Sequence, residues 1–129
     1  MTTFLLDASV LIPLADEAHE FHDRVDSWIS DGHSIALSSV TEGAMVRYLV
    51  RKGVPVADVQ DGLRAMHQQD ECTFWPDSLS YADADLSHVR GHRQVTGAYL
   101  LALAESHGAR LVTLDEALAA ASEIALLVP

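Results

Sequence analysis

The chain of 129 residues contains one cysteine, one lysine and no long hydrophobic run. Because Cys72 is the only thiol, no disulfide can form within the chain, and the cysteine usage gives no sign of secretion. At the N-terminus, Asp7 interrupts the apolar run 4–6 too early for a signal peptide or a membrane span, and no basic residue precedes it. These absences predict a cytoplasmic domain without a membrane segment.

Positive charge is also scarce. Eight Lys and Arg residues stand against 19 Asp and Glu residues, which gives a formal net charge of −11. Such a chain repels nucleic acid in general and attracts basic partners. Binding of RNA or DNA would therefore need a local basic patch or a bound cation. The length and the 49% hydrophobic content suffice for one domain with its own core, and we predict a single domain over residues 1–129.

Short apolar runs alternate along the chain with longer segments of helical period, and there is no internal repeat. The runs are 4–6, 34–37, 73–75, 111–114 and 124–128. They are continuous rather than alternating, which is typical of strands in a parallel sheet that helices cover on both faces. Apolar residues spaced for one helix face predict helices near 21–29 and 56–66, and further helices are expected over 40–52, 95–104 and 116–121. Gly32, Gly53 and Gly108 follow helical patterns, as C-terminal caps do.

This order of elements predicts a three-layer α/β/α sandwich with a mostly parallel sheet of four or five strands. In such sheets, ligands bind beyond the carboxyl ends of the strands, near the point where the strand order reverses. The segment 95–104 is apolar on nearly every side. We expect it to pack between the sheet and a further apolar surface, which favours a homodimer.

Three acidic residues come after strands of the predicted sheet. Asp7 follows the first strand directly, Glu42 stands five residues after the second, and Asp115 follows the fourth directly. Because the carboxyl ends of parallel strands meet at one edge, these side chains are predicted to converge. Carboxylate oxygens are the ligands that Mg²⁺ and Mn²⁺ prefer, and such a cation can activate water and neutralise charge on a phosphodiester.

Each acid also has a plain structural interpretation. Glu42 stands three residues after Ser39 and could complete a capping box, and Asp115 could be the N-cap of the following helix. Asp7 is harder to explain in this way, because an acid that closes a buried strand needs a partner or a cation. The joint placement of the three acids therefore favours a functional site.

The motifs that carry these residues resemble those of PIN domains, and the chain as a whole is similar to VapC toxins of VapBC toxin–antitoxin pairs, above all the mycobacterial ones. The matching blocks are LLDASVL (5–11), TE (41–42), GHRQVTGAYLLALA (91–104) and LVTLD (111–115). The resemblance spans essentially the whole chain. It implies a Mg²⁺- or Mn²⁺-dependent ribonuclease that cuts cellular RNA. It also implies a VapB antitoxin as partner, whose C-terminal segment enters the active-site groove.

Carried over by position, the resemblance implies roles for individual residues. Asp7, Glu42 and Asp115 match three of the family's four acids, which hold the metal and serve catalysis. Ser9 matches the small polar residue that supports the first acid, and Thr113 matches the hydroxyl residue before the last one.

The family's fourth acid, third in chain order, should stand where this sequence has Gly97. We therefore expect metal binding and activity to be weak or absent. Glycine also lowers the stability of a helix interior, less if Thr96 is the N-cap, and no compensating gain is evident from the sequence. Both a natural loss of activity and an inactivating substitution fit this departure. A catalytically dead binding module that only engages a protein partner is the alternative function.

Two basic clusters are candidates for RNA contact. Arg90 and Arg93 lie near the vacant acid position and could bind phosphate, although they could instead pair with Asp83 and Asp85 upstream. Arg47, Arg51 and Lys52 form a second cluster, which is equally typical of a solvated helix end.

Other chemistries fit less well. The histidine pairs 19/22 and 88/92 lack a third ligand for zinc, so they are interpreted as surface or capping residues. A haloacid-dehalogenase-like phosphatase would need an acid where Ser9 stands, and a receiver domain would need an acidic pair and a late lysine.

Overall fold

The computed structural model describes residues 2–76 and 78–129. The strands are β1 (Thr3–Leu6), β2 (Ser34–Ser38), β3 (Cys72–Trp75), β4 (Arg110–Thr113) and β5 (Ala125–Leu127). The helices are α1 (Ala8–Ala15), α2 (His22–Ser30), α3 (Ser39–Arg51), α4 (Val56–His67), α5 (Val95–Ser106) and α6 (Glu116–Ala121), and a 3-10 turn spans His92–Gln94. Each strand and helix predicted from the sequence has a counterpart within a few residues of its expected bounds, and α1 is an additional helix for which no bounds were predicted.

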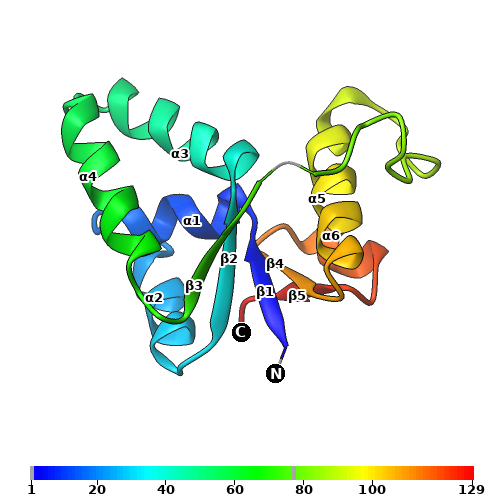
Figure 1. Ribbon diagram of the computed structural model, residues 1–129, viewed down its shortest axis with the longest axis horizontal. Helices are drawn as coiled ribbons and strands as arrows, with labels where there is room; N and C mark the ends of the chain where they lie inside the picture. Colours follow the sequence, from blue (N-terminus) through cyan, green and yellow to red (C-terminus); the bar gives the residue numbers. More distant parts are fainter. Residues whose placement is uncertain (1, 77) are drawn as a thin grey trace.

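The five strands form one sheet in the order β3-β2-β1-β4-β5, and every pairing is parallel. The predicted parallel sheet is thereby confirmed. The strand order reverses at β1, because β2 and β3 extend the sheet to one side while β4 and β5 extend it to the other (Figure 1). Leu6 is level with Val112 across β1 and β4. The carboxyl ends of these two central strands therefore lie side by side, where ligands bind in such folds.

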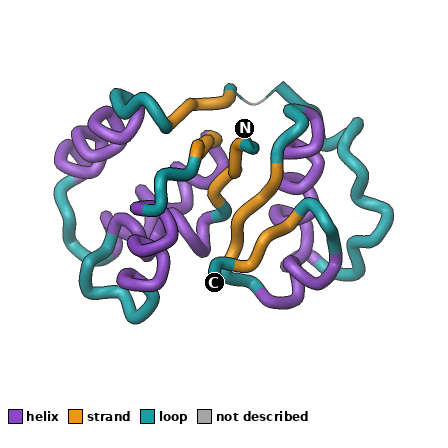
Figure 2. The backbone as a smooth tube through the Cα atoms, turned by 90° about the horizontal axis from the view of Figure 1, so that it is seen from below, coloured by secondary structure: helices purple, strands orange, loops and turns teal. Residues whose placement is uncertain are grey.

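Helices cover both faces of the sheet, as the predicted sandwich requires (Figure 2). On one face, residues of α1, α2, α3 and α4 form a core with the strands, and its fully buried members include Leu6, Val10 and Leu37. On the other face, α5 provides most of the core, with Leu100 and Leu103 fully buried against Leu5, Leu111 and their neighbours. Gly53 and Gly108 end their helices with φ of 93° and 63°, a backbone region that favours glycine.

The apolar faces of α5 are covered from within the chain, which differs from the expectation that a second subunit is needed. Leu79 and Ala84, in the loop that precedes α5, pack against the same core, and so does Leu118 of α6. Tyr81 of this loop stacks on Tyr99 with ring centroids 4.3 Å apart. The apolar character of α5 therefore does not argue for a homodimer, which stays a prediction.

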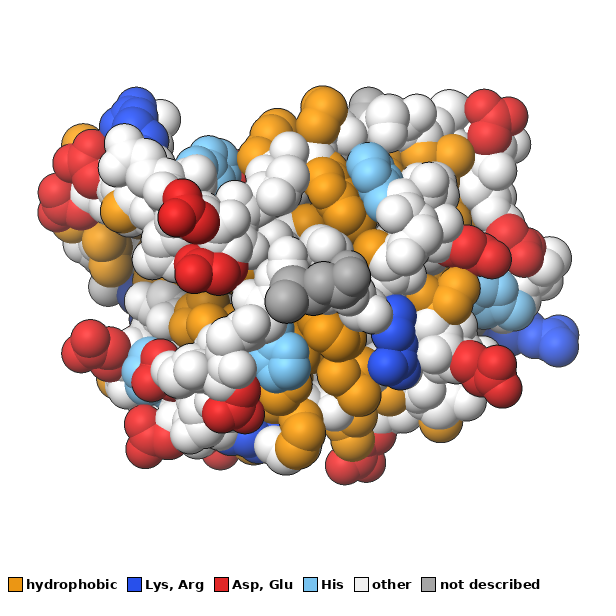
Figure 3. All heavy atoms as spheres, turned by 60° about the horizontal axis from the view of Figure 1, so that its bottom comes forward, with side chains coloured by type: hydrophobic (Ala, Val, Ile, Leu, Met, Phe, Trp, Pro, Cys, Tyr) orange, Lys and Arg blue, Asp and Glu red, His pale blue; other side chains and the backbone are white. Residues whose placement is uncertain are grey.

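Acidic side chains are spread over the face at the amino ends of the strands, as the net charge of −11 leads one to expect (Figure 3). Among the described helices, none is both long and apolar enough to cross a membrane.

A polar cluster joins the end of α1 to the end of α3. The Tyr48 hydroxyl donates to Asp16 Oδ2 at 2.8 Å, and Lys52 Nζ donates to the same oxygen at 3.1 Å. The hydrogen bond from Tyr48 and then that from Lys52 hold the pKa of Asp16 below its ordinary value. Lys52 thus forms an ion pair within the chain instead of standing in a free basic cluster.

We predict that this cluster makes stability depend on pH through Asp16. Its folded-state pKa lies below that of the unfolded chain, so its contribution is present at neutral pH and is lost as the pH falls through the folded-state value. The urea midpoint of Asp16→Asn should therefore be lower than that of the parent at pH 7, and the two should converge in acid. Asp70→Asn, at an exposed position, is the control. A difference that is equal at every pH would contradict the assignment.

Candidate active site at the carboxyl edge of the sheet

Asp7 is held at the end of β1 by two hydroxyl groups, one from the adjacent first turn of α1 and one from the distant strand β4. Its Oδ2 accepts hydrogen bonds from Ser9 Oγ at 2.8 Å and from Thr113 Oγ1 at 2.7 Å. Its Oδ1 accepts from the backbone N–H of Ala8 at 2.9 Å, so Asp7 is also the N-cap of α1. The side chain thus has a fixed direction, as a ligand or catalytic group requires.

The same hydroxyl groups fix the start of the segment that leads to Asp115. Ser9 Oγ accepts from the backbone N–H of Leu114 at 2.9 Å, and Thr113 Oγ1 accepts from that of Asp115 at 3.0 Å. Asp115 Oδ1 accepts from the backbone N–H of Leu118 at 3.1 Å. The N-cap interpretation of Asp115 is therefore correct, and the residue is exposed at the same edge as Asp7.

Asp7 and Asp115 line one pocket of about 240 Å³ together with Gly97, Arg93 and His88. Arg93 comes from the 3-10 turn before α5 and is exposed. The pocket therefore places an acidic pair beside a guanidinium, an arrangement that suits a phosphate held next to a cation.

Gly97 lies in the first turn of α5, which has Gln94 rather than Thr96 as its N-cap. A Cβ atom added at Gly97 would lie 3.1 Å from both Cδ atoms of Leu118. This close approach of α6 to α5 is a gain from glycine that the sequence does not reveal. An aspartate at this position would require the flexible end of the Leu118 side chain to shift by a few tenths of an ångström.

Glu42 does not take part in the capping box at the start of α3, contrary to its capping interpretation. The N-cap of α3 is Ser38, whose backbone N–H donates to Thr41 Oγ1 at 3.5 Å, so the capping box does not involve Ser39 and Glu42. Glu42 Oε2 instead lies 2.6 Å from Nε2 of His67, at the end of α4. Glu42 is not among the residues that line the pocket of Asp7 and Asp115.

The Glu42 carboxylate also affects the only thiol. Burial, and to a lesser degree the negative charge of Glu42, raises the pKa of Cys72. The thiol therefore stays protonated at neutral pH, and a protonated, buried thiol is a poor nucleophile.

Arg90 and Arg93 do not form ion pairs with Asp83 or Asp85. Within the described part of the chain, the salt bridges join Lys52 to Asp16, Arg64 to Asp61 and His67 to Glu42. Asp85 accepts from Ser87 instead, and these hydrogen bonds lower its pKa. Arg93 lines the pocket, whereas Arg90 is exposed and is not part of its lining.

The oxygen donors at the pocket are of the kind that Mg²⁺ and Mn²⁺ prefer, but there are too few of them to hold such a cation on their own. Asp7 and Asp115 supply carboxylate oxygens at one pocket, Glu42 is turned to His67, and Gly97 supplies no ligand. Among residues 2–76 and 78–129, no three His, Cys, Asp or Glu side chains are arranged to hold a metal ion. The predicted metal ligands therefore stay predictions.

The fold class to which this architecture belongs is seen in two solved structures. The toxin–antitoxin complex from Klebsiella pneumoniae superposes with a TM-score of 0.70 at 16% identity, covering 95% of this chain and 95% of that one. Mycobacterium tuberculosis VapC20, named a sarcin-ricin loop cleaving toxin, superposes with a TM-score of 0.70 at 15% identity, covering 92% and 95%. A model of the PIN domain matches residues 4–124, so the parallel sandwich is that of a PIN domain.

The sequence comparison narrows this class. Ribonuclease VapC29 of Mycobacterium tuberculosis is 43% identical over 129 residues, which cover 98% of this chain and 97% of the relative. Ribonuclease VapC44 of the same organism is 37% identical over 125 residues, covering 89% and 87%. The chain belongs to the VapC family of PIN-domain ribonucleases.

We predict that the hydroxyl of Thr113 stabilises the fold through Asp7. Thr113→Val keeps the shape of the side chain but leaves the partly buried Asp7 carboxylate without one of its donors, which should lower the free energy of unfolding by about 1–3 kcal/mol. Thr113→Ser, which keeps a hydroxyl, should lose less. Urea unfolding of the three proteins measures this, and equal stability of all three would show that the hydrogen bond contributes nothing.

Proposed function

We propose that this chain is the toxin of a type II toxin–antitoxin system, an endoribonuclease that depends on Mg²⁺ or Mn²⁺ and is weakened at position 97. The observation that carries the proposal is the shared pocket of Asp7, Asp115 and Gly97 at the carboxyl ends of β1 and β4. Two acids of the family's motif meet there, beside the position where the third is missing. The ribonuclease names of the VapC relatives agree with this activity.

The chain's own residues would divide the work as follows. Asp7, Glu42 and Asp115 are the residues that would hold the cation, and Glu42 would have to leave its contact with His67 to do so. Ser9 and Thr113 keep Asp7 in one orientation through their hydrogen bonds. Arg93, on the wall of the pocket, would bind a phosphate oxygen of the RNA, and Arg90 could contact the chain further along.

When bound, Mg²⁺ or Mn²⁺ supplies an activated water for attack on the phosphodiester and offsets its negative charge. No side chain then needs to act as the nucleophile.

Gly97 leaves the site with one carboxylate fewer than the family's pattern. Fewer oxygen ligands and less negative charge lower the affinity for a hard divalent cation. The alternative, a binding module that has lost catalysis, is favoured by one observation, the packing of Leu118 against Gly97. In that case the position has been adapted for packing, and restoring an acid would not restore activity.

As partner we propose a VapB-type antitoxin. A net charge of −11 suits a basic, arginine-bearing segment, whose capture would be fast at low salt. The name of the Klebsiella pneumoniae structure, a toxin–antitoxin complex, agrees with such a pairing for a protein of this fold. We also propose that the chain forms a homodimer. Light scattering at protein concentrations of tens of micromolar would test this, and a strictly monomeric species would count against it.

Gly97→Asp should create or strengthen divalent-dependent cleavage of cellular RNA. The cleavage rate should rise at least tenfold at millimolar Mn²⁺, because the new carboxylate adds about one metal ligand to the site. Gly97→Ala is the matched control, because it adds the same Cβ beside Leu118 without the carboxylate. The measurement is the rate of cleavage of total RNA with Mn²⁺ and with EDTA.

The crowding beside Leu118 calls for a second variant. Gly97→Asp combined with Leu118→Ala gives the new carboxylate room, so a poor gain from Gly97→Asp alone should improve in the double variant. Equal cleavage by the parent, Gly97→Ala and Gly97→Asp would show that position 97 is dispensable. Cleavage that persists in EDTA would contradict the proposed role of the cation.

A further inference from the structure

A second hollow adjoins the candidate active site. Its volume is about 380 Å³, and Asp115 lines both this hollow and the pocket that contains Asp7 and Gly97. Ser9 lies at the same side, while the rings of His19, Phe21 and Tyr48 line the hollow with apolar neighbours from α1. We call it the aromatic hollow.

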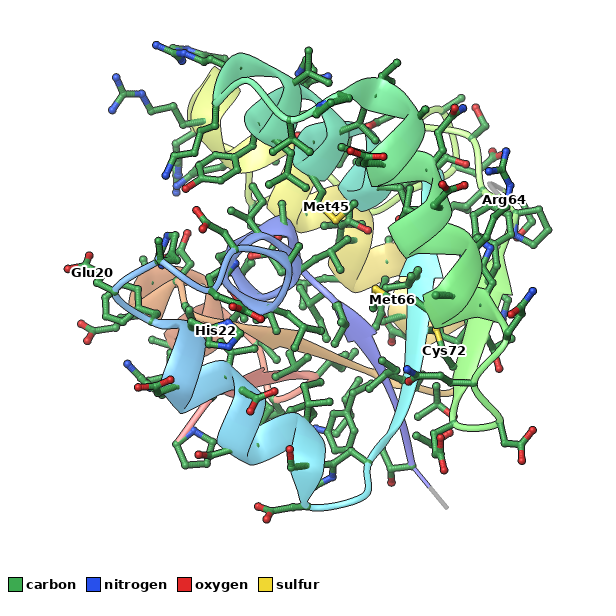
Figure 4. All side chains as sticks on the ribbon, turned by 90° about the vertical axis from the view of Figure 1, so that its left-hand side faces the viewer. Glu20, His22, Met45, Arg64, Met66 and Cys72 are labelled. Carbon is green, nitrogen blue, oxygen red and sulfur yellow. The ribbon has the colours of Figure 1, made fainter. Side chains whose placement is uncertain are left out.

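The aromatic hollow is built partly from the loop between α1 and α2. Figure 4 shows this loop projecting at the side of the molecule, where Glu20 points outward and His22 begins α2.

The three rings lie near one another, and hydrogen bonds fix two of them, those of His19 and Tyr48. The centroid of His19 is 5.8 Å from that of Phe21 and 6.5 Å from that of Tyr48. The Tyr48 hydroxyl is fixed by Asp16, and His19 Nδ1 accepts the backbone N–H of Phe21 at 3.1 Å. In the neutral ring this leaves the proton on Nε2 of His19 as a donor. The orientations of His19 and Tyr48 in the hollow are thus fixed before any ligand binds.

Among the rings that line the aromatic hollow, that of Phe21 is the best candidate for contact with a ligand. Although Phe21 is a large apolar residue, it is 38% exposed. It does not fill a core position. Its exposed ring lines a hollow that Asp115 also lines, so the ring is accessible to a ligand bound there.

Cations flank the rings but are already engaged. Arg24 Cζ lies 6.0 Å from the centroid of Phe21, and Lys52 Nζ lies 5.1 Å from that of Tyr48. Arg24 donates to the carbonyl oxygen of Val128 at 3.2 Å, and Lys52 pairs with Asp16. The hollow therefore offers π faces more than free positive charge.

We propose that the aromatic hollow binds one unpaired nucleobase of the RNA, adjacent to the phosphate that lies over Asp7 and Asp115. This inference rests on the proposed function and specifies how the substrate is held. A chain with a net charge of −11 gains little from general attraction to RNA, whereas stacking of a base on aromatic rings does not depend on charge. The site would thus use stacking where most RNA-binding surfaces use basic residues.

The polar groups at the rim favour a base over an aliphatic side chain. Nε2 of His19 can donate to a ring nitrogen or carbonyl oxygen of a base, whereas an aliphatic side chain would leave this N–H without an acceptor. On the other side of Asp115, Arg93 and Thr96 line the pocket with groups suited to phosphate and sugar. One RNA strand can therefore place a base and its neighbouring phosphate on the two sides of Asp115.

The first test measures binding without cleavage. A short single-stranded RNA with one 2-aminopurine would be titrated with the chain in EDTA, where the proposed cation-dependent cleavage cannot occur, and binding would be followed by the quenching of 2-aminopurine fluorescence on stacking. Phe21→Leu should weaken binding about tenfold, in line with the stacking contribution of one base. Phe21→Trp, which keeps a ring, should restore it. Tyr81→Leu, which removes an exposed ring outside the hollow, is the control.

Thermal unfolding of each variant shows that a loss of binding is not a loss of fold. An RNA that lacks the base at one position should bind the parent about tenfold less tightly and should show no further loss with Phe21→Leu. If Phe21→Leu weakens intact and abasic RNA equally, or not at all, the hollow does not hold a base.

The second test separates this inference from the proposed function. In the Gly97→Asp background, Phe21→Leu should raise KM about tenfold and leave kcat unchanged, because it removes binding without touching the acids. Cleavage by Gly97→Asp that is insensitive to Phe21→Leu would overturn the hollow while the ribonuclease stands. Failure of every variant to bind or cut RNA would overturn both. Loss of affinity for an antitoxin with unchanged affinity for RNA would mark the hollow as a protein contact and would also overturn the inference.

Discussion

The parallel pairing of β1 with β4 at the centre of the sheet is the constraint on which the candidate site depends. It sets Leu6 level with Val112, so the next residues along the chain, Asp7 just after β1 and Thr113 at the end of β4, come within hydrogen-bond distance. Ser9 completes the contact from the first turn of α1. A carboxylate at the end of a buried strand would be costly without such donors, and here two hydroxyl groups and a backbone N–H satisfy it. The same hydroxyl groups accept hydrogen bonds from the backbone N–H groups of Leu114 and Asp115. The contacts that orient Asp7 therefore also fix the backbone position of Asp115.

Position 97 shows how packing and catalysis compete at one residue. The close approach of Leu118 tightens the contact of α6 with α5, and a side chain at 97 would disturb it. A carboxylate there would supply charge to the pocket but would also repel Asp7 and Asp115 when no cation is bound. Glycine therefore suits a protein that is stable without metal, whereas an acid would make stability depend on the cation through linkage.

Much of the fold could be predicted because the sequence patterns are local. Continuous apolar runs gave strands of a buried parallel sheet, and this topology brings Asp7 and Asp115 to one edge whatever separates them along the chain. The covering of α5 could not be predicted in the same way. The loop that packs on it has no periodicity, and Leu79 and Ala84 are single apolar residues in a polar segment.

The finer features of the site depend on contacts between elements that no local pattern encodes. His67 ends α4 and meets Glu42 from α3, and neither residue's neighbours in sequence signal the other. Leu118 lies on the short helix α6, and its contact with Gly97 depends on how α5 and α6 cross. The capping interpretation of Glu42 is wrong although Ser39 and Glu42 have the spacing of a capping box, because the backbone at the end of β2 makes Ser38 the N-cap and pairs it with Thr41.

The central claim is that the carboxyl edge of β1 and β4 is the cation site. Paramagnetic broadening of backbone amide signals by Mn²⁺, measured by NMR on the chain and on Gly97→Asp, tests this most directly. The account predicts broadening centred on Asp7, position 97 and Asp115 in both proteins, at lower Mn²⁺ concentrations in Gly97→Asp than in the parent. Broadening centred on other acidic residues, or none near Asp7 in either protein, would contradict it.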